Sequence, residues 1–353
     1  MILDRLGVPI VLAPLAGGPS TPQLAAAVSN AGGLGFVAGG YLTAATLAQR
    51  LGQTGALTSA PIGVNLFVPG HPAAPGPVEA YAASLAAEAR DAGVDLGVPS
   101  FEDDDWAAKL TLLAAAPAPV VSFTFGCPDL TVIGDLHRAG SEVWVTVTTP
   151  AEARHAAGLS ADALIVQGME AGGHRASFRD DPADVADGLG LLSLLQLVRA
   201  DVDVPLVAAG GIGTGAGVAA VLAAGAAAAQ LGTAFMRCPE AGTAGVHRQA
   251  LAGTEPTAVT RAFTGRLARG IRNRFLDQHS ASAPTAYPEI HHLTAPLRAK
   301  GRAAGDPGLV NLWAGQTYPL GSEIPAGQLV LALAGQALAA ARQAAERLSA
   351  AGD

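Results

Sequence analysis

Short apolar runs alternate with alanine-rich helical stretches along the first two thirds of the chain. The runs are continuous rather than alternating in polarity, which is typical of parallel strands covered on both faces. A helix between two such strands gives a right-handed crossover. The pattern predicts eight strands: Pro9–Ala13, Leu34–Ala38, Ile62–Phe67, Val120–Phe125, Glu142–Thr148, Ala163–Val166, Pro205–Ala209 and Ala228–Phe235.

Helical patterns separate most of these strands. Because a closed TIM barrel is built from eight strand–helix units, we expect an α/β fold of the (β/α)8 barrel type. An open doubly wound sheet is the alternative, since hydrophobic periodicity does not report closure. The predicted helices are Thr21–Ala31, Ala44–Gly55, Glu79–Ala92, Asp129–Ala139, Pro150–Gly158, Leu189–Ala200 and Thr214–Ala224.

The pattern changes after Phe235. Residues 239–321 are rich in Thr, Arg, His and Pro and contain no strand-like run. A helical pattern returns over Glu323–Ser349. The sequence therefore predicts a barrel domain over residues 1–238, completed by a C-terminal helix within 322–353. It predicts a smaller, mostly α-helical cap or substrate domain over residues 239–321.

The composition excludes several classes of protein. Half of the 353 residues are hydrophobic and 14% are charged, which excludes a disordered chain and a coiled coil. The net charge of -8 excludes a nucleic-acid-binding surface, which needs clustered Lys and Arg. The only cysteines, Cys127 and Cys238, form no zinc or disulfide motif, as expected in a reducing cytoplasm.

No membrane segment is predicted. The N-terminus lacks the basic start and long apolar region of a signal peptide. Residues 205–236 contain no charged side chain, but their Ala and Gly content and the turn-like GGIGTGAG indicate a buried strand, helix and strand. We expect a cytoplasmic protein, monomeric or homodimeric, that binds neither membrane nor nucleic acid.

Glycines accumulate where the predicted strands end. In a barrel these ends carry the active site, and glycine lets the backbone approach a ligand and expose its N–H groups. Gly210, Gly211 and Gly213 follow the seventh strand, and Gly232 and Thr233 lie in the eighth. Because these two loops hold phosphate in many barrels, we expect them to bind one phosphate group, with tight turns alone as the alternative.

One motif in this region suggests a different ligand. Gly211, Gly213 and Ala216 form G-x-G-x-x-A between a strand and a helix, which is the dinucleotide fingerprint. That fingerprint needs an acidic residue about 20 residues later for the ribose hydroxyls. No Asp or Glu lies between Asp203 and Glu240, so a mononucleotide phosphate agrees better with the sequence.

His174 is the predicted acid–base residue. It follows two glycines in the loop after the sixth strand and lies outside any apolar helical stripe. Glu170 is the alternative carboxylate, unless it only binds a backbone N–H group or Arg175. Cys127 has no identifiable base, and we expect it to be a small buried residue.

The other polar clusters are predicted to be structural. His291 and His292 are adjacent and diverge on a helix, without a third ligand at a suitable spacing, so no metal site is predicted. Five arginines of the second domain are expected to form a solvated or carboxylate-paired surface rather than to steer an anion: Arg261, Arg266, Arg269, Arg272 and Arg274.

An ordered series of blocks carries a family resemblance. The blocks are APLAGG, GGLGFVAGGYLT, IGVNLF, VVSFTFGCP, ALIVQGMEAGGHRASF, PLVAAGGI and AAQLGTAF, with LWAGQ near Leu312–Gln316. Through them the chain resembles the nitronate monooxygenases, formerly called 2-nitropropane dioxygenases, and in particular the bacterial class I type. The resemblance implies a flavin-binding TIM barrel with a second, mostly α-helical domain.

The resemblance also implies the residues of the site. His174 matches the family's active-site histidine, although Ala176 stands where many relatives have glycine. FMN is the implied cofactor. Its implied contacts are Asn65, Gln167, Gly172, Gly211, Gln230, Leu231, Gly232 and Thr233.

The implied reaction is the oxidative denitrification of an alkyl nitronate, such as propionate 3-nitronate. FMN and O2 would convert it to a carbonyl compound and nitrite. His174 would position the nitro oxygens or remove the α-proton of a neutral nitroalkane. Two alternatives remain. One is an FMN-dependent NAD(P)H:quinone reductase or enoyl-acyl-carrier-protein reductase on the same barrel, and the other is a non-catalytic binder of a phosphate ligand.

Overall fold

A computed structural model describes residues 1–180 and 188–350. Residues 181–187 of the predicted barrel domain and 351–353 of the predicted C-terminal helix lie outside the described residues. All eight predicted strands are present and parallel, which confirms the (β/α)8 barrel. The strands are β1 (Ile10–Leu12), β2 (Gly35–Ala38), β3 (Ile62–Phe67), β4 (Val120–Thr124), β5 (Glu142–Val147), β6 (Ala163–Gln167), β8 (Leu206–Ala209) and β9 (Ala228–Leu231).

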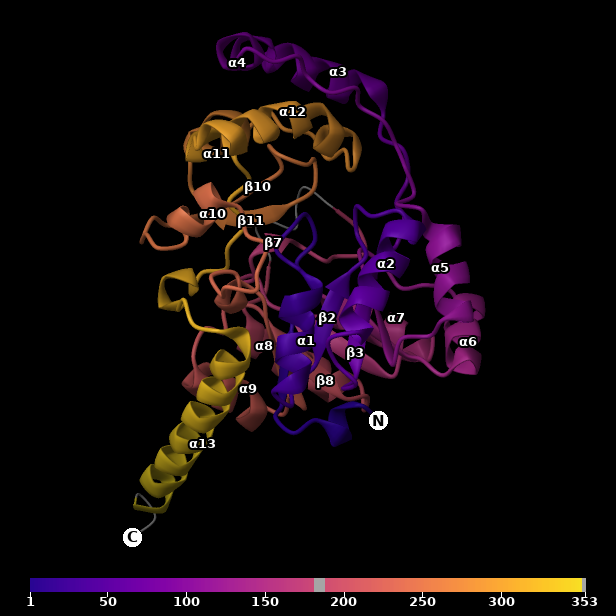
Figure 1. Cartoon of the computed structure of the whole chain (residues 1–353), viewed down its shortest axis with the longest axis vertical. Helices are drawn as coiled ribbons and strands as arrows, with labels where there is room; N and C mark the ends of the chain where they lie inside the picture. Colours follow the sequence, from indigo (N-terminus) through magenta and orange to yellow (C-terminus); the bar gives the residue numbers. More distant parts are fainter. Residues whose placement is uncertain (181–187, 351–353) are drawn as a thin grey trace.

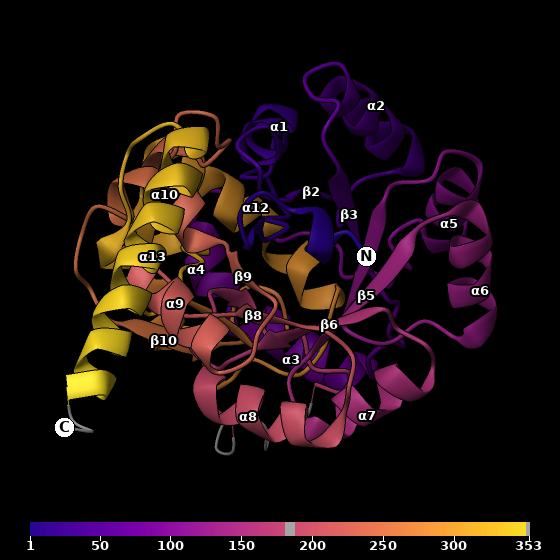
Figure 2. The same ribbon diagram turned by 90° about the horizontal axis from the view of Figure 1, so that it is seen from below.

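The sheet closes on itself. Its strand order is β1-β9-β8-β6-β5-β4-β3-β2, and a bridge between Val11 and Leu34 joins the two ends. The Leu12 N–H donates to the Leu34 carbonyl at 2.9 Å across this seam. Alternate strand residues such as Phe36 and Trp144 fill the barrel interior, and their neighbours pack outward against the helices. Figure 2 shows the strands surrounded by helices.

Five of the described helices around the barrel begin at side-chain caps. The Thr21 hydroxyl accepts the Leu24 N–H, and Thr43, Asp129, Thr149 and Thr214 cap their helices in the same way. These caps satisfy N–H groups that a helix leaves unpaired at its start. The barrel helices are α1 (Pro22–Asn30), α2 (Ala44–Gly55), α5 (Trp106–Ala115), α6 (Leu130–Ala139), α7 (Pro150–Gly158), α8 (Leu191–Asp201) and α9 (Gly215–Ala223).

The C-terminal helix α13 (Ala326–Ala350) completes the ring of helices. It packs against α9 and α1, and its far half extends away from the body (Figure 1). A side chain on Gly215 of α9 would overlap Gln336, so α9 and α13 approach at backbone distance. In the described part of the chain, short 3-10 helices cover Leu3–Arg5, Thr233–Phe235, Pro307–Leu309 and Tyr318–Leu320. The predicted eighth strand is therefore shorter than expected, because Thr233–Phe235 leaves the sheet.

A second layer covers the carboxyl ends of the strands (Figure 1). It contains α10 (Gly245–Ala250), β10 (Thr257–Thr260), β11 (Ala268–Ile271), α11 (Arg274–His279) and α12 (Glu289–Ala304). The prediction that residues 239–321 contain no strand is wrong. The four-residue segments TAVT and ARGI have too little apolar character to be recognised, and they become strands only by pairing with each other and with β7 (Gly173–His174).

One predicted barrel helix belongs to this second layer. The predicted helix Glu79–Ala92 is two helices, α3 (Pro75–Ser84) and α4 (Ala86–Ala92), which lie against α12 (Figure 1). The barrel crossover is made instead by α5, which the sequence analysis missed. The chain between β3 and α5 is long enough to reach the second layer, where apolar residues of α3 and α4 find a separate core.

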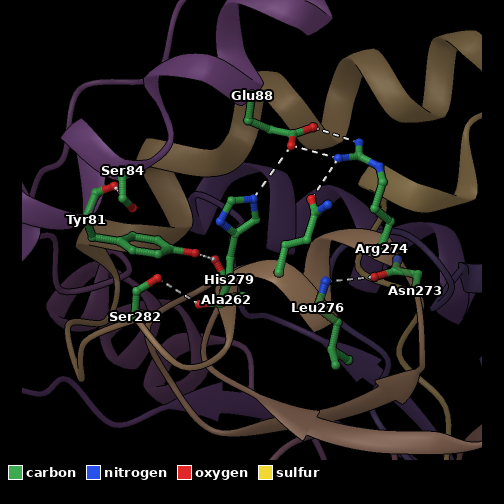
Figure 3. Close-up of polar contacts among 10 residues, drawn as sticks. Tyr81, Ser84, Glu88, Ala262, Asn273, Arg274, Leu276, His279 and Ser282 are labelled. Carbon is green, nitrogen blue, oxygen red and sulfur yellow. Dashed lines mark hydrogen bonds and ion pairs between the residues drawn. The ribbon is translucent and has the colours of Figure 1, made fainter.

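Figure 3 shows how this excursion is fixed. The Tyr81 hydroxyl donates to the Ala262 carbonyl at 2.8 Å, and Glu88 forms an ion pair with Arg274 at 2.7 Å. Leu85 is fully buried in a core with Phe263 and Ile290. The division of the chain at residues 238 and 321 stays a prediction, and residues 75–92 pack with the segment that follows the barrel strands.

Among the described residues, no helix combines the length and the apolar character that crossing a membrane requires.

We expect Leu85→Ala to lower the free energy of unfolding by about 2–5 kcal/mol, because it leaves a cavity in the shared core. Chemical denaturation followed by circular dichroism measures this change. Leu338→Ala on α13 is the matched control, since Leu338 is 54% exposed and should change stability by about 0.5 kcal/mol or less. Equal effects of the two variants would contradict the packing of α4 into a core.

Candidate active site

A cavity of about 470 Å³ lies between the carboxyl ends of the barrel strands and the second layer. The structure brings all nine predicted site residues together in its wall. They are Asn65, Gln167, Gly172, His174, Gly211, Gln230, Leu231, Gly232 and Thr233. The strand ends supply seven of them, because parallel strands end at one edge of the barrel.

The glycines form a cradle with free backbone donors. Gly210 and Gly211 have φ values of 111° and 67°, a region that favours glycine. The N–H groups of Gly211, Gly232 and Thr233 find no acceptor among the described residues. A side chain on Gly172 would overlap the backbone of Ala314. The cradle therefore exposes backbone donors to the cavity, which is the chemistry that an anion requires.

The N-terminus of α9 contributes less than the sequence suggested. The Gly215 N–H donates to Gln336 Oε1 at 3.2 Å, and the Gly217 N–H donates to the Thr214 hydroxyl at 3.2 Å. Gly213 packs against Thr317 and does not line the cavity. The free donors thus come from the loops at Gly211 and Gly232 rather than from the helix itself.

Three of the amide side chains that line the cavity differ in their hydrogen bonding. Asn65 Nδ2 donates to the hydroxyls of Ser122 and Thr124 at 2.9 and 3.0 Å, which links the end of β3 to the neighbouring strand β4. Gln167 is committed to the loop of His174, donating to the His174 carbonyl and accepting from the Ala176 N–H. Gln230 is only 4% exposed, and its Nε2 has no hydrogen-bond partner. Gln230 Nε2 is therefore a buried donor that no acceptor among the described residues satisfies.

His174 lies in a strand rather than a free loop. It belongs to β7, where it pairs with Ala268 of β11. Its Nε2 lies 2.9 Å from the Thr264 hydroxyl, which in turn donates to the Arg266 carbonyl at 3.3 Å. With that direction of donation, His174 Nε2 carries the proton and Nδ1 keeps its lone pair. Among the described residues, no carboxylate accepts a hydrogen bond from this ring.

His174 is neutral at ordinary pH. Burial lowers its pKa to about 3, and the nearby charges of Arg266 and Arg298 act in the same direction. The ring therefore hydrogen bonds as a neutral imidazole and is a weak base. Burial likewise lowers the pKa of His247, another residue of the cavity wall, to about 4.

Aromatic rings surround His174. The Phe125, Tyr287 and Trp313 rings have centroids 5.6–5.7 Å from the imidazole. Tyr41 stacks on His291 at 4.4 Å with an interplanar angle of 6°. The prediction that His291 only supports the cap is therefore too narrow, because its ring lines the cavity.

Tyr41 is held by a buried ion pair. Its N–H donates to Asp104 Oδ1 at 2.8 Å, and Asp104 Oδ2 pairs with Lys109 Nζ at 2.8 Å. Lys109 is 1% exposed, so the pair is shielded from solvent. Tyr41 itself has a φ of 65°. The segment before α5 thus fixes the loop after β2 in a conformation that places the Tyr41 ring in the cavity.

The other candidates lie outside the cavity. Both carboxylate oxygens of Glu170 accept the Leu191 N–H at the start of α8, as the alternative role predicted. Burial raises the pKa of the half-buried Cys127 thiol to about 12, which makes it unreactive. No group of three His, Cys, Asp or Glu residues that could hold a metal ion exists among the described residues.

The predicted arginine surface is only partly correct. Arg272 pairs with Asp277 and Arg274 with Glu88 at the surface. Arg266 is 8% exposed, donates to the carbonyls of Arg175 and Ser177, and lies 4.0 Å from the centre of the Phe125 ring. It became buried because the second layer folds over β7, which no local sequence pattern reports.

The sequence analysis missed several residues of the cavity. Tyr41 follows two glycines directly after β2, and that position was a usable signal. Trp313 lies in the LWAGQ block of the resemblance but was given no role there, and Thr264 gave no signal, because it reaches the site through contacts between distant segments. Arg298 and Arg302 are four residues apart on α12, but only the tertiary structure shows which side of the helix faces the cavity.

Comparison with known proteins shows the family. The family model described as nitronate monooxygenase matches residues 2–335. A nitronate monooxygenase of Paraburkholderia phytofirmans is 38% identical over 352 residues, covering 94% of this chain and 93% of the relative. One of Pseudomonas aeruginosa is 39% identical over 338 residues, covering 92% and 95% of the two chains.

A solved structure also matches the whole fold. A nitroalkane oxidase from Streptomyces ansochromogenes superimposes with a TM-score of 0.95 at 52% sequence identity. The match covers 97% of this chain and 99% of that chain, so it includes both the barrel and the second layer.

The state of His174 can be tested by nuclear magnetic resonance. Because its pKa is about 3, its imidazole nitrogen shifts should stay those of a neutral ring from pH 8 down to about pH 5. Signals that disappear in His174→Asn identify the residue. A titration of those signals with a midpoint near 6.5, which is about the ordinary pKa of histidine, would contradict the neutral ring.

Proposed function

Since the chain belongs to the nitronate monooxygenase family, we propose that it catalyses the oxidative denitrification of alkyl nitronates, with FMN as cofactor and O2 as co-substrate. The products are a carbonyl compound and nitrite. The observation that carries the proposal is the convergence of a glycine cradle, a buried amide donor and a neutral histidine on one cavity.

The residues of the cavity suit a flavin. Gln230 Nε2 is a buried donor without a partner, as expected where a cofactor carbonyl or ring nitrogen would accept its hydrogen bond. The free N–H groups at Gly211, Gly232 and Thr233 suit a phosphate. When bound, a flavin accepts electrons from the substrate and passes them to O2.

A single phosphate cradle favours FMN over FAD. The free backbone donors gather at the two loops after β8 and β9, and no Asp or Glu follows within the distance expected for a ribose contact. A dinucleotide would need a second cradle of backbone donors for its pyrophosphate. We therefore propose FMN.

His174 has a positioning role in this proposal. Thr264 fixes the tautomer and orientation of the ring, so that Nδ1 is the free polar atom. A nitronate has already lost its α-proton, and for such a substrate a weak base suffices. The surrounding Phe125, Trp313 and Tyr287 rings exclude water and match an alkyl group.

We expect Gly232→Val to weaken FMN binding by about 10- to 100-fold, the range for losing a hydrogen bond to a charged group. A side chain at this position would occupy space beside the free N–H groups. Flavin released on denaturation is identified by mass and titrated back into the apoprotein.

Gly52→Val is the control, because a side chain there meets no atom within 4 Å. A Cβ atom at position 232 would lie 3.2 Å from Leu15. The melting temperature of both variants shows whether this contact disturbs the fold. Release of FAD, or no flavin after reconstitution, would refute the cofactor assignment.

Purified holoenzyme should release nitrite in air from alkyl nitronates such as propionate 3-nitronate. Because the neutral ring is a weak base, we expect His174→Asn to lower kcat/KM by similar factors for a neutral nitroalkane and for its matched nitronate. A loss about 10²–10⁴-fold larger for the nitroalkane would show that the ring removes the α-proton. Asn keeps an N–H donor for the Thr264 hydroxyl and replaces the basic Nδ1 with a non-basic amide oxygen. The measurement is kcat/KM for both forms at equal flavin occupancy.

Equal losses for both forms at full occupancy would show that His174 orients the substrate without acting as a base. Loss of flavin in His174→Asn would show a structural role. Rapid anaerobic bleaching of the flavin by NADH or NADPH, together with no nitrite from any nitronate, would overturn the proposed function in favour of a reductase.

A further inference from the structure

Arg298 is a buried cation without an ion pair. It is 5% exposed, lines the cavity and forms no salt bridge with any described carboxylate. Its Nε donates to the Thr294 hydroxyl at 3.1 Å, and its Nη2 donates to the His291 carbonyl at 2.6 Å. These two bonds hold the guanidinium in place and leave Nη1 without an acceptor among the described residues.

Arg302 follows one helical turn later. It also lines the cavity, is exposed at its mouth, and makes no ion pair or side-chain hydrogen bond within the described part of the chain. Like charges four residues apart on a helix repel each other. Both charges face the cavity. If the only role of the helix were packing, removing one of the two charges would therefore stabilise it.

These arginines are the positive charge of the cavity wall. The three histidines of the cavity wall, His174, His247 and His291, have depressed pKa values and are neutral. Arg266 lies behind the Phe125 ring and is engaged by backbone carbonyls. Burial lowers the pKa of Arg298 to about 10, which still leaves the guanidinium charged at neutral pH. An unpaired buried charge is costly unless an anion joins it.

We propose that Arg298 and Arg302 form an anion subsite that selects the ionised nitronate over the neutral nitroalkane. Arg302 at the mouth attracts the anion, and Arg298 meets it further inside with its free Nη1. The inference rests on the proposed function for the identity of the substrate. The subsite and the glycine cradle come from different elements, because Arg298 and Arg302 lie on α12 and the cradle glycines follow β8 and β9.

Binding of an unreactive anion tests the subsite without turnover. Butanoate has the shape and charge of propyl-1-nitronate, and butanamide has nearly the same shape without the charge. We expect the holoenzyme to bind butanoate at least about tenfold more tightly than butanamide by calorimetry. Added salt should reduce this preference, since the outer arginine is exposed to solvent.

Substitutions at three positions of α12 locate the effect. Arg302→Gln should weaken butanoate binding by about 3- to 10-fold, and the buried Arg298→Gln by about 10- to 100-fold. Arg298→Lys should restore part of the loss. Lys300→Gln is the matched control, because it removes the same charge from the same helix at an exposed position outside the cavity, and it should change binding by less than about twofold.

The same variants should change specificity in turnover. The ratio of kcat/KM for propyl-1-nitronate to that for 1-nitropropane should fall in Arg302→Gln and not in Lys300→Gln. If Arg298→Gln does not fold, the exposed Arg302→Gln decides the question by itself.

Two outcomes would overturn the subsite. One is equal affinity of the parent enzyme for butanoate and butanamide. The other is an Arg302→Gln variant that binds butanoate as tightly as Lys300→Gln does. A protein that prefers butanoate through these arginines but releases no nitrite from any nitronate would refute the proposed function and support the anion subsite.

Discussion

The pairing of β7 with β11 is the contact on which the site depends. It joins two residues of a barrel loop, Gly173 and His174, to Arg269 and Ala268 of the second layer. The next N–H, of Arg175, donates to the Leu267 carbonyl at 2.8 Å and continues the attachment. Because backbone bonds carry this attachment, the second layer and the histidine are fixed together over the barrel. The cavity is the space that this arrangement encloses.

Charged side chains support the junction from within. The Arg175 guanidinium donates to the carbonyls of Gln167 and Thr148, and that of Arg266 donates to the carbonyls of Arg175 and Ser177. These arginines replace secondary-structure partners for irregular backbone at the strand ends. Burial keeps the imidazole of His174 neutral, and the positive charges of Arg266 and Arg298 act in the same direction. Arginine thus supplies the positive charge of the cavity wall, while His174 contributes a neutral ring in a fixed orientation.

The sequence predicted the barrel well because its signals are local. Continuous apolar runs mark strands covered on both faces, and residues such as Thr43 and Asp129 mark the starts of helices by capping them. The glycines at Gly211 and Gly232 indicated the cradle because they follow the last two barrel strands, where the backbone can approach a ligand closely. The error in the helix after β3 has a clear source. The helices at Tyr81 and Glu88 were assigned to the barrel by their position in the chain, whereas their apolar residues pack in a different core.

The sequence by itself determined the (β/α)8 barrel, the cradle at the strand ends and His174 as a residue of the site, since each follows from short-range patterns and from the common edge of parallel strands. Only the tertiary structure decided the short sheet that holds His174, the burial of Arg266 and the direction of Arg298 and Arg302. Those features arise where segments about 100 residues apart in the chain meet. Their strand segments have weak intrinsic preference, and a charged residue has no local signal that tells a solvent-facing position from a cavity wall.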